Sequence, residues 1–271
     1  MIQSDPGLQK WSYGKMIGGG GSGRVYRTLN SQTGCLYAVK KVHLCEADEQ
    51  ECKTEISILS KISHENIVRY VEHYHLPEET LIFMEYVPGT LKKFYKDFGP
   101  PPLETYLYFA KQLVAALDYL HEHKIMHKDL KCANVLLTNK GVLKLSDFGC
   151  SKDFDRTISF INYQVEGSKT QKGTPHWMAP ESIIDAIYNI QTDVWGLGCT
   201  LLELATGNLP WAEKNLDAHK IMMYIGSKNE VPAIPEDLPQ VIQNIVSSCL
   251  KREPKERITL KELSKIIEKA S

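Results

Sequence analysis

The stretch "IMHKDLKCANVLL", Ile125 to Leu137, places three chemically capable side chains just before an apolar run. Asp129 can accept a proton, Lys131 can attract an anion, and Asn134 can offer an oxygen atom to a metal ion. Loops between a helix and a strand are often rich in these residue types, so the pattern alone carries little weight. A functional interpretation requires partners elsewhere in the chain: residues that hold a nucleotide, and a second carboxylate for the metal.

Composition narrows the class of protein. The 271 residues are 42% hydrophobic, and 32 Lys and Arg balance 33 Asp and Glu to a net charge of −1. This balance argues against a nucleic-acid or membrane-surface binder. The seven cysteines are scattered without a C-x-x-C pair, which is typical of reduced thiols in the cytoplasm or nucleus and not of a zinc site. No stretch resembles a signal peptide or a membrane span.

Hydrophobic patterning predicts a sheet-rich N-terminal part followed by a helical remainder. Strands are expected on both sides of a glycine cluster within 13–30, at 35–42, and as a hairpin over 66–87, with one helix near 48–62. A breaker, "VPGT", follows at Val87 to Thr90. Beyond it we expect a long amphipathic helix over 103–123, two short strands within 134–146, and an apolar helix from Asp193 to the breaker Gly207.

The glycine cluster "IGGGGSGRV" contains the pattern G-x-G-x-x-G-x-V as Gly18, Gly20, Gly23 and Val25. Glycine lets a backbone approach phosphate oxygens closely and present N–H groups to them. A dinucleotide-binding loop would open a helix at this point. Here the β-favouring residues "RVYR" follow, so the sequence favours a glycine-rich hairpin lying over a nucleotide.

Lys40 ends the strand "YAVK" that follows this hairpin. A strand lysine is usually a solvated charge, but next to the hairpin it can reach phosphates, with Glu55 on the following helix as its counter-charge. An ordinary exposed carboxylate is the alternative for Glu55. We expect the two residues to form an ion pair in the active state. We also expect Lys40 to face solvent and therefore to contribute little to stability.

Asp147 in "LSDFG" lies at the end of a predicted strand, and a two-strand segment brings its loop back to that of Asp129. Asp147 and Asn134 then offer a pair of oxygen ligands suited to Mg²⁺. Asp129 is left to accept the proton of an attacking hydroxyl, and Lys131 to offer positive charge to a transferring phosphoryl group.

Together these stretches resemble a eukaryotic protein kinase over about Trp11 to Leu263, because the glycine loop, "AVK", Glu55, "HKDLKCAN", "DFG" and "APE" follow in that family's order and spacing. The resemblance implies an α+β, bilobal fold within one kinase domain spanning 1–271. A small antiparallel sheet lobe with one helix would cover 11–87, a larger, mainly helical lobe 88–266, and an activation segment 147–181. The chain begins just before the glycine loop, which suits a domain cut from a longer protein.

The resemblance also implies ATP and Mg²⁺ as cofactors, and roles for individual residues. Met84 matches the gatekeeper position, and the backbone at Glu85 and Val87 would bind the adenine edge. Further residues match family positions that sandwich the adenine ring (Ile17, Val25, Ala38, Leu136), build the regulatory spine (Leu59, His127, Phe148), brace the catalytic loop (Asp193), or pair with the glutamate of "APE" (Arg257 with Glu181).

Lys131 in "DLKCAN" and Thr174 in "GTPHWMAPE" resemble serine/threonine kinases, and "WMAPE", "HENIVRY" and "MEYVPG" resemble the MAP kinase kinase kinase and Ste20-like branch. This implies protein substrates, possibly downstream kinases in a signalling cascade, and a cytoplasmic or nuclear location. A pseudokinase scaffold is the main alternative. Lys40, Glu55, Asp129, Asn134 and Asp147 are all present, which disfavours it. A metabolite kinase or a non-enzymatic interaction domain fits less well.

Two features concern regulation. The activation segment carries the hydroxyl residues Thr157, Ser159, Ser168 and Thr170, of which we expect Ser168 or Thr170 to be phosphorylated. Lys128 replaces the arginine of the family's "HRD" motif. Lysine is a point charge that makes no bidentate phosphate contact, so we expect weaker coupling to a loop phosphate. A conservative exchange without consequence is the alternative.

Overall fold

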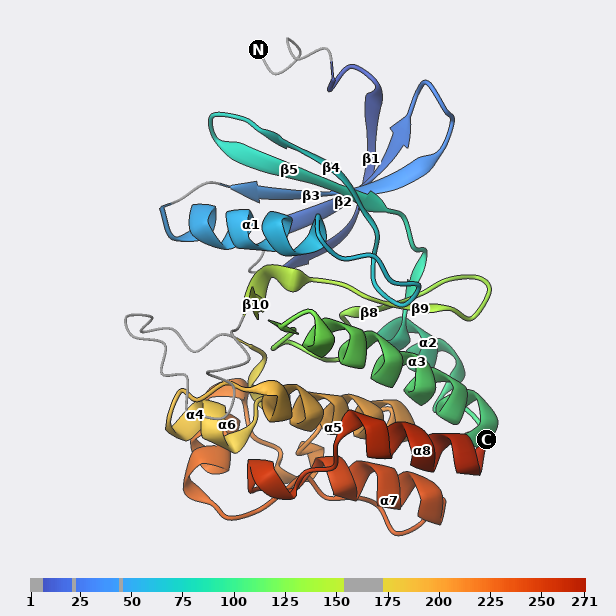
Figure 1. The fold of residues 1–271 in the computed structure, drawn as a ribbon, viewed down its shortest axis with the longest axis vertical. Helices are drawn as coiled ribbons and strands as arrows, with labels where there is room; N and C mark the ends of the chain where they lie inside the picture. The colour runs from blue at the N-terminus through green and yellow to red at the C-terminus, as the bar shows by residue number, and fades with distance from the viewer. Residues whose placement is uncertain (1–6, 21–22, 44–45, 154–172) are drawn as a thin grey trace.

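The computed structural model describes residues 7–20, 23–43, 46–153 and 173–271. Figure 1 shows two stacked parts: a twisted sheet with one helix beside it, and below them a larger group of helices in which the chain ends. One hydrophobic core runs from Ile58 and Leu59 in the upper part to Trp195 and Leu263 in the lower part. Because the core is continuous, the loops between the two parts are held from both sides.

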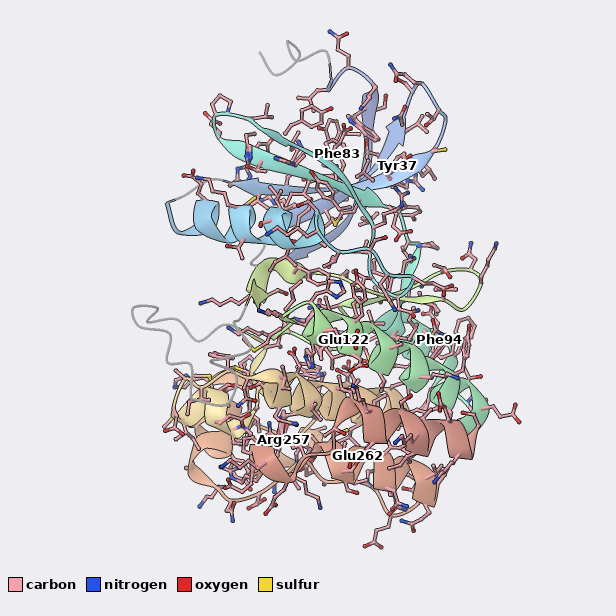
Figure 2. The ribbon with its side chains drawn as sticks, in the orientation of Figure 1. Tyr37, Phe83, Phe94, Glu122, Arg257 and Glu262 are labelled. Carbon is pink, nitrogen blue, oxygen red and sulfur yellow. The ribbon has the colours of Figure 1, made fainter. Side chains whose placement is uncertain are left out.

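The upper part is a five-stranded antiparallel sheet in the order β1-β2-β3-β5-β4. Its strands are β1 (Trp11–Gly20), β2 (Gly23–Asn30), β3 (Leu36–His43), β4 (Tyr70–His75) and β5 (Glu79–Glu85). Helix α1 (Glu46–Leu59) packs beside β3. A second apolar cluster includes Trp11, whose ring stacks on Phe83 at 4.4 Å and meets Tyr37 edge-on at 5.1 Å. Figure 2 shows Phe83 and Tyr37 in this sheet.

The lower part is built on the long helices α3 (Leu103–Glu122) and α5 (Ile190–Thr206). Asn189 caps the start of α5 with a capping box, and Gly207 ends it in the left-handed conformation at φ 70°. The remaining helices are α2 (Leu91–Phe98), α4 (Pro180–Ile184), α6 (Ala218–Ser227), α7 (Gln240–Cys249) and α8 (Leu260–Ala270). Short 3₁₀ turns lie at Phe148–Cys150, Pro175–Trp177, Ala212–Lys214 and Pro254–Glu256.

Short strands join the two parts. Strands β6 (Gly89–Thr90), β8 (Val135–Leu137) and β9 (Leu143–Leu145) form one small sheet, and β7 (Ile125–Met126) pairs with β10 (Lys152–Asp153). The stretch 125–137 therefore runs from β7 through a loop into β8. This arrangement fixes both ends of the loop that carries Asp129.

The predicted bilobal fold is confirmed, and so are the glycine hairpin and the helix terminus at Gly207. Helix α1 ends at Leu59, three residues before the predicted end, and α5 begins at Ile190, not at Asp193. Helix α2 was not predicted, although Thr90 caps it through a 3.0 Å bond from the Lys93 backbone N–H. The lobe boundary at 87/88 stays a prediction. Among the described residues no helix is long and apolar enough to cross a membrane.

Candidate active site

A cleft of about 850 Å³ lies between the two parts of the fold. The glycine hairpin and β3 line it from above, and the loops around β8 and β9 line it from below. The predicted nucleotide-binding residues that line the cleft are Ile17, Gly18, Gly23, Val25, Ala38, Lys40, Met84, Glu85, Val87 and Leu136. Gly20 lies at the end of the hairpin, where it pairs with Gly23.

The hairpin needs glycine at one described position in particular. Gly23 has a φ of 128°, and a Cβ atom there would lie 2.6 Å from the carbonyl oxygen of Lys41. A side chain is therefore excluded both by backbone strain and by contact with the neighbouring strand. Gly18 pairs with Val25 across the hairpin. Gly23 thus serves close packing of the hairpin onto β3, as well as any approach to phosphate.

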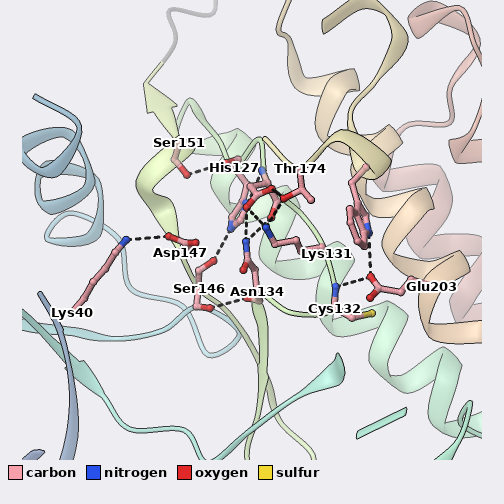
Figure 3. A network of polar contacts seen from close by, with 12 residues as sticks. Lys40, His127, Lys131, Cys132, Asn134, Ser146, Asp147, Ser151, Thr174 and Glu203 are labelled. Carbon is pink, nitrogen blue, oxygen red and sulfur yellow. Dashed lines mark hydrogen bonds and ion pairs between the residues drawn. The ribbon is translucent and has the colours of Figure 1, made fainter. Parts of the chain in front are cut away.

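Lys40 reaches across the cleft from β3. Its Nζ atom lies 2.8 Å from both carboxylate oxygens of Glu55 and 3.0 Å from Oδ1 of Asp147 (Figure 3 shows the second contact). Burial by itself lowers the pKa of Lys40, but the carboxylates of Glu55 and Asp147 outweigh it and raise the pKa above the ordinary value. The predicted ion pair is thus present.

The expectation that Lys40 faces solvent is wrong. Lys40 and Glu55 are each only 3% exposed. The reason is tertiary: α1 covers β3, so the lysine at the inner face of the strand lies between a helix and the cleft. The small stability contribution expected of an exposed lysine therefore does not apply to Lys40.

Asp129 is the centre of a polar network in the loop after β7. Its Oδ2 atom accepts hydrogen bonds from Lys131 Nζ at 2.6 Å and from Asn134 Nδ2 at 2.8 Å, and its Oδ1 atom accepts one from the Thr174 hydroxyl at 2.7 Å. Lys131 also donates to the Thr174 hydroxyl. Asp129 is 6% exposed and lines the cleft. The arrangement can present a carboxylate and an ammonium group to one incoming hydroxyl group. Figure 3 shows Lys131, Asn134 and Thr174, the partners of Asp129 in this network.

Asn134 and Asp147 both line the same cleft. The Ser146 backbone N–H and hydroxyl both donate to the carbonyl oxygen of Asn134, at 3.0 and 2.8 Å, which ties the two loops together beside these side chains. One carboxylate and one amide oxygen fit Mg²⁺, which usually takes one or two protein ligands together with phosphate oxygens and water. The donor set present therefore suits the predicted metal.

Asp193 braces the loop after β7, as predicted. Its carboxylate accepts the backbone N–H groups of His127 at 2.9 Å and Lys128 at 2.8 Å, and it contacts His121 Nε2 at 2.9 Å. Burial raises the pKa of Asp193, but hydrogen bonds and nearby histidines outweigh it, so the pKa lies below its ordinary value. Lys128 has a φ of 69°, and its Nζ atom lies 3.6 Å from the centre of the Tyr188 ring.

Two further predicted arrangements are present. Arg257 forms a bidentate pair with Glu181 at 2.7 and 2.8 Å, with the arginine 3% exposed. The spine residues Leu59, His127 and Phe148 are buried, and the His127 and Phe148 rings meet at 5.1 Å. The predicted phosphorylation sites at Thr157, Ser159, Ser168 and Thr170 lie outside the described residues.

Sequence reasoning missed Glu203, a carboxylate within α5 that is fully buried. A signal was available, because Glu203 is an isolated charge within the apolar run "GLGCTLLELATG". For Thr174 the sequence indicates only its place in a motif. The structure adds that its hydroxyl contacts Asp129 directly.

Comparison with known proteins agrees with this geometry. The protein kinase domain family matches residues 11–266. The chain belongs to the protein kinase domain family. Similar proteins include mitogen-activated protein kinase kinase kinase 3 of Arabidopsis thaliana, at 38% identity over 94% of this chain and 40% of that protein.

Two further similar proteins come from other organisms. Mitogen-activated protein kinase kinase kinase A of Dictyostelium discoideum is 36% identical, and mitogen-activated protein kinase kinase kinase 19 of Homo sapiens is 35% identical, each over 94% of this kinase chain. The chain spans 27% and 20% of those two proteins, so it matches well under half of these relatives. The predicted resemblance to this kinase branch is confirmed.

Proposed function

We propose that this chain is an ATP-dependent serine/threonine protein kinase that transfers the γ-phosphoryl group of ATP to a hydroxyl group of a protein substrate. The observation that carries the proposal is the Asp129 network, in which one carboxylate contacts Lys131, Asn134 and Thr174 in the cleft that also contains the Lys40–Glu55 pair. Phosphoryl transfer depends on positioning and electrostatic stabilisation, which such a network supplies.

Each side chain then has a separate task. Lys40, held by Glu55, binds phosphate oxygens, while Asn134 and Asp147 would hold Mg²⁺, which neutralises phosphate charge when bound. Asp129 orients the substrate hydroxyl and accepts its proton, and Lys131 offers positive charge beside it. Ile17, Val25, Ala38 and Leu136 would enclose the adenine ring, with Met84 behind it and the backbone at Glu85 and Val87 at its edge.

The similarity to mitogen-activated protein kinase kinase kinases supports the proposal that the substrates are downstream kinases of a signalling cascade. We propose that this cascade operates in the cytoplasm or nucleus, in line with the scattered, unpaired spacing of the cysteines. The choice of serine and threonine over tyrosine as acceptors is supported by Lys131 in "DLKCAN" and Thr174 in "GTPHWMAPE", which match serine/threonine kinases in type and position. No observation among the described residues favours the pseudokinase alternative.

The test is phosphorylation of a positional-scanning peptide library by the purified protein with radiolabelled ATP and Mg²⁺, in parallel with Asp129→Asn. We expect transfer to Ser and Thr peptides, little transfer to Tyr peptides, and a loss of turnover in the variant. Equal signals from the two proteins would show that the activity does not depend on this site, and the proposal would be wrong.

A further inference from the structure

One lysine that lines the cleft has no task in the proposed phosphoryl transfer. Among the described residues, the charged side chains lining the cleft are Lys40, Glu55, Glu85, Lys93, Asp129, Lys131 and Asp147. Glu85 is paired with Lys144 at 2.8 Å, and all the others except Lys93 belong to the phosphoryl-transfer site. Lys93 lies on α2 at the exposed edge of the cleft, with a side chain that is 67% exposed.

The backbone of Lys93 is held in a fixed place relative to the catalytic residues. Its N–H group donates to the Thr90 hydroxyl at 3.0 Å. The backbone N–H of Lys92 donates to the carbonyl oxygen of Cys132 at 3.1 Å, and Cys132 lies three residues after Asp129. Helix α2 therefore begins on the loop that carries Asp129. A peptide whose hydroxyl group lies at Asp129 should meet Lys93 at one particular position of its chain.

The ammonium group of Lys93 can exchange its present partner for an anion from outside the protein. It contacts Asp97 at 2.6 Å, but both side chains of this i,i+4 pair are exposed. Such a pair contributes little to stability, and the order with the lysine before the acid is the weaker one on a helix. Helix α2 also carries Lys92 and Lys96 against the single acid Asp97, so the helix as a whole attracts anions.

Lys93 lies away from the end of the cleft where phosphate would bind. That end is marked by Lys40, which contacts Glu55 of α1 and Asp147. In Figure 1, α1 lies on the left, whereas α2 lies on the right below the segment that connects the two parts of the fold. The anion that suits Lys93 is therefore a group of the peptide substrate and not a phosphate held by Lys40.

We propose that Lys93 is a specificity-determining residue that binds an acidic side chain of the protein substrate, Asp or Glu, at one position near the acceptor serine or threonine. The inference rests on the proposed kinase function and narrows its substrates to hydroxyl residues with an acidic neighbour. An ion pair at the exposed edge of the cleft contributes to binding of the peptide and not to the chemical step. It should therefore lower the KM for the peptide and leave kcat and the KM for ATP unchanged.

The test compares Lys93→Glu with Lys96→Glu in the intact chain. Both substitutions change the charge of the same helix by the same amount, but Lys96 is not among the described residues that line the cleft. Lys93→Met removes the charge without reversing it. Each protein is assayed with a positional-scanning peptide library. KM and kcat are then measured for peptides with Asp, Ala or Lys at the selected position, together with the KM for ATP.

We expect the native protein to select Asp or Glu at one position near the acceptor, with kcat/KM about two- to fivefold above that of the Ala peptide, the range of an exposed ion pair. Lys93→Met should abolish this preference, and Lys93→Glu should reverse it in favour of Lys. Lys96→Glu should keep the native preference. In the native protein the preference should nearly vanish at about 1 M salt, where the screening length falls to about 3 Å.

Several results would overturn the inference. They are the absence of an acidic preference in the native protein, an unchanged preference in Lys93→Glu, and equal changes in Lys93→Glu and Lys96→Glu, which would indicate a diffuse effect of helix charge. A raised KM for ATP in Lys93→Glu with an unaltered peptide preference would assign Lys93 to the nucleotide and overturn it too. A native protein that phosphorylates no peptide would instead refute the proposed function.

Discussion

Replacing Lys40 with methionine should destabilise the protein as well as inactivate it. Lys40 is 3% exposed and lies 2.8 Å from Glu55, which is also 3% exposed. Methionine preserves much of the side-chain volume but removes the positive charge, so Glu55 keeps a desolvated carboxylate without its lysine. Breaking a buried pair in this way costs about 3–5 kcal/mol. Activity should also be lost, because the phosphate-binding charge is gone.

The adjacent residue on the same strand provides a matched control. Lys41 pairs with Glu79 at 3.3 Å, but its side chain is 26% exposed. Partly exposed pairs contribute about 0–1 kcal/mol, so Lys41→Met should cost little. For a domain of this size each kcal/mol lowers Tm by roughly 2–4 °C. Lys40→Met should therefore lower Tm by about 6–20 °C, and Lys41→Met by no more than about 4 °C.

The measurement is thermal unfolding followed by circular dichroism without nucleotide, with urea unfolding as an independent check. Kinase activity is measured at a temperature where both variants are folded. If the two variants unfold at the same temperature, the buried pair does not stabilise the fold and the argument from burial is refuted. If Lys40→Met is folded and retains activity, the phosphate-binding role of Lys40 is also wrong.

Three further outcomes are expected. Asp147→Asn should weaken Mg²⁺–ATP binding and so raise the KM for ATP, while Asp129→Asn should mainly lower kcat. A near-normal kcat in Asp129→Asn would contradict the role of Asp129 as the base. Phosphatase treatment should lower the activity of the native protein modestly and that of Lys128→Arg more steeply, because only arginine makes a bidentate phosphate contact. Equal, near-total losses of activity in both proteins would show that lysine binds the phosphate as well as arginine does. Asp193 has a pKa below its ordinary 3.8, so it contributes stability that is present above pH 3.8 and is lost as the pH falls through the folded-state value. The stability difference between the native protein and Asp193→Asn should therefore shrink in acid unfolding experiments below pH 3.8, and a difference independent of pH would refute this assignment.

Local patterns were sufficient for much of the fold. The glycine hairpin, the long amphipathic helix α3 and the end of α5 at Gly207 follow from signals within a few residues, and the structure contains all three. The sequence did not predict helix α2, because this helix is only eight residues long, is rich in lysine and buries only Leu91 and Tyr95. Such a helix is stabilised by the surface it packs on, which a local pattern does not show.

The sequence by itself determined which chemical groups this protein carries and in what order, because motif residues are recognised by type and spacing. The order runs from the glycine cluster through Lys40 and Glu55 to Asp129 and Asp147. Only the tertiary structure decided how deeply those groups are buried and which of them share a partner. The sequence predicts a solvent-facing Lys40, but α1 covers its strand and buries it. Glu203 is an isolated charge in the sequence, and only the fold brings Tyr95, Cys132 and Trp177, up to 108 residues away along the chain, into contact with it. Burial and hydrogen-bond sharing depend on segments that meet only after folding, so the spacing of residues along the chain does not encode them directly.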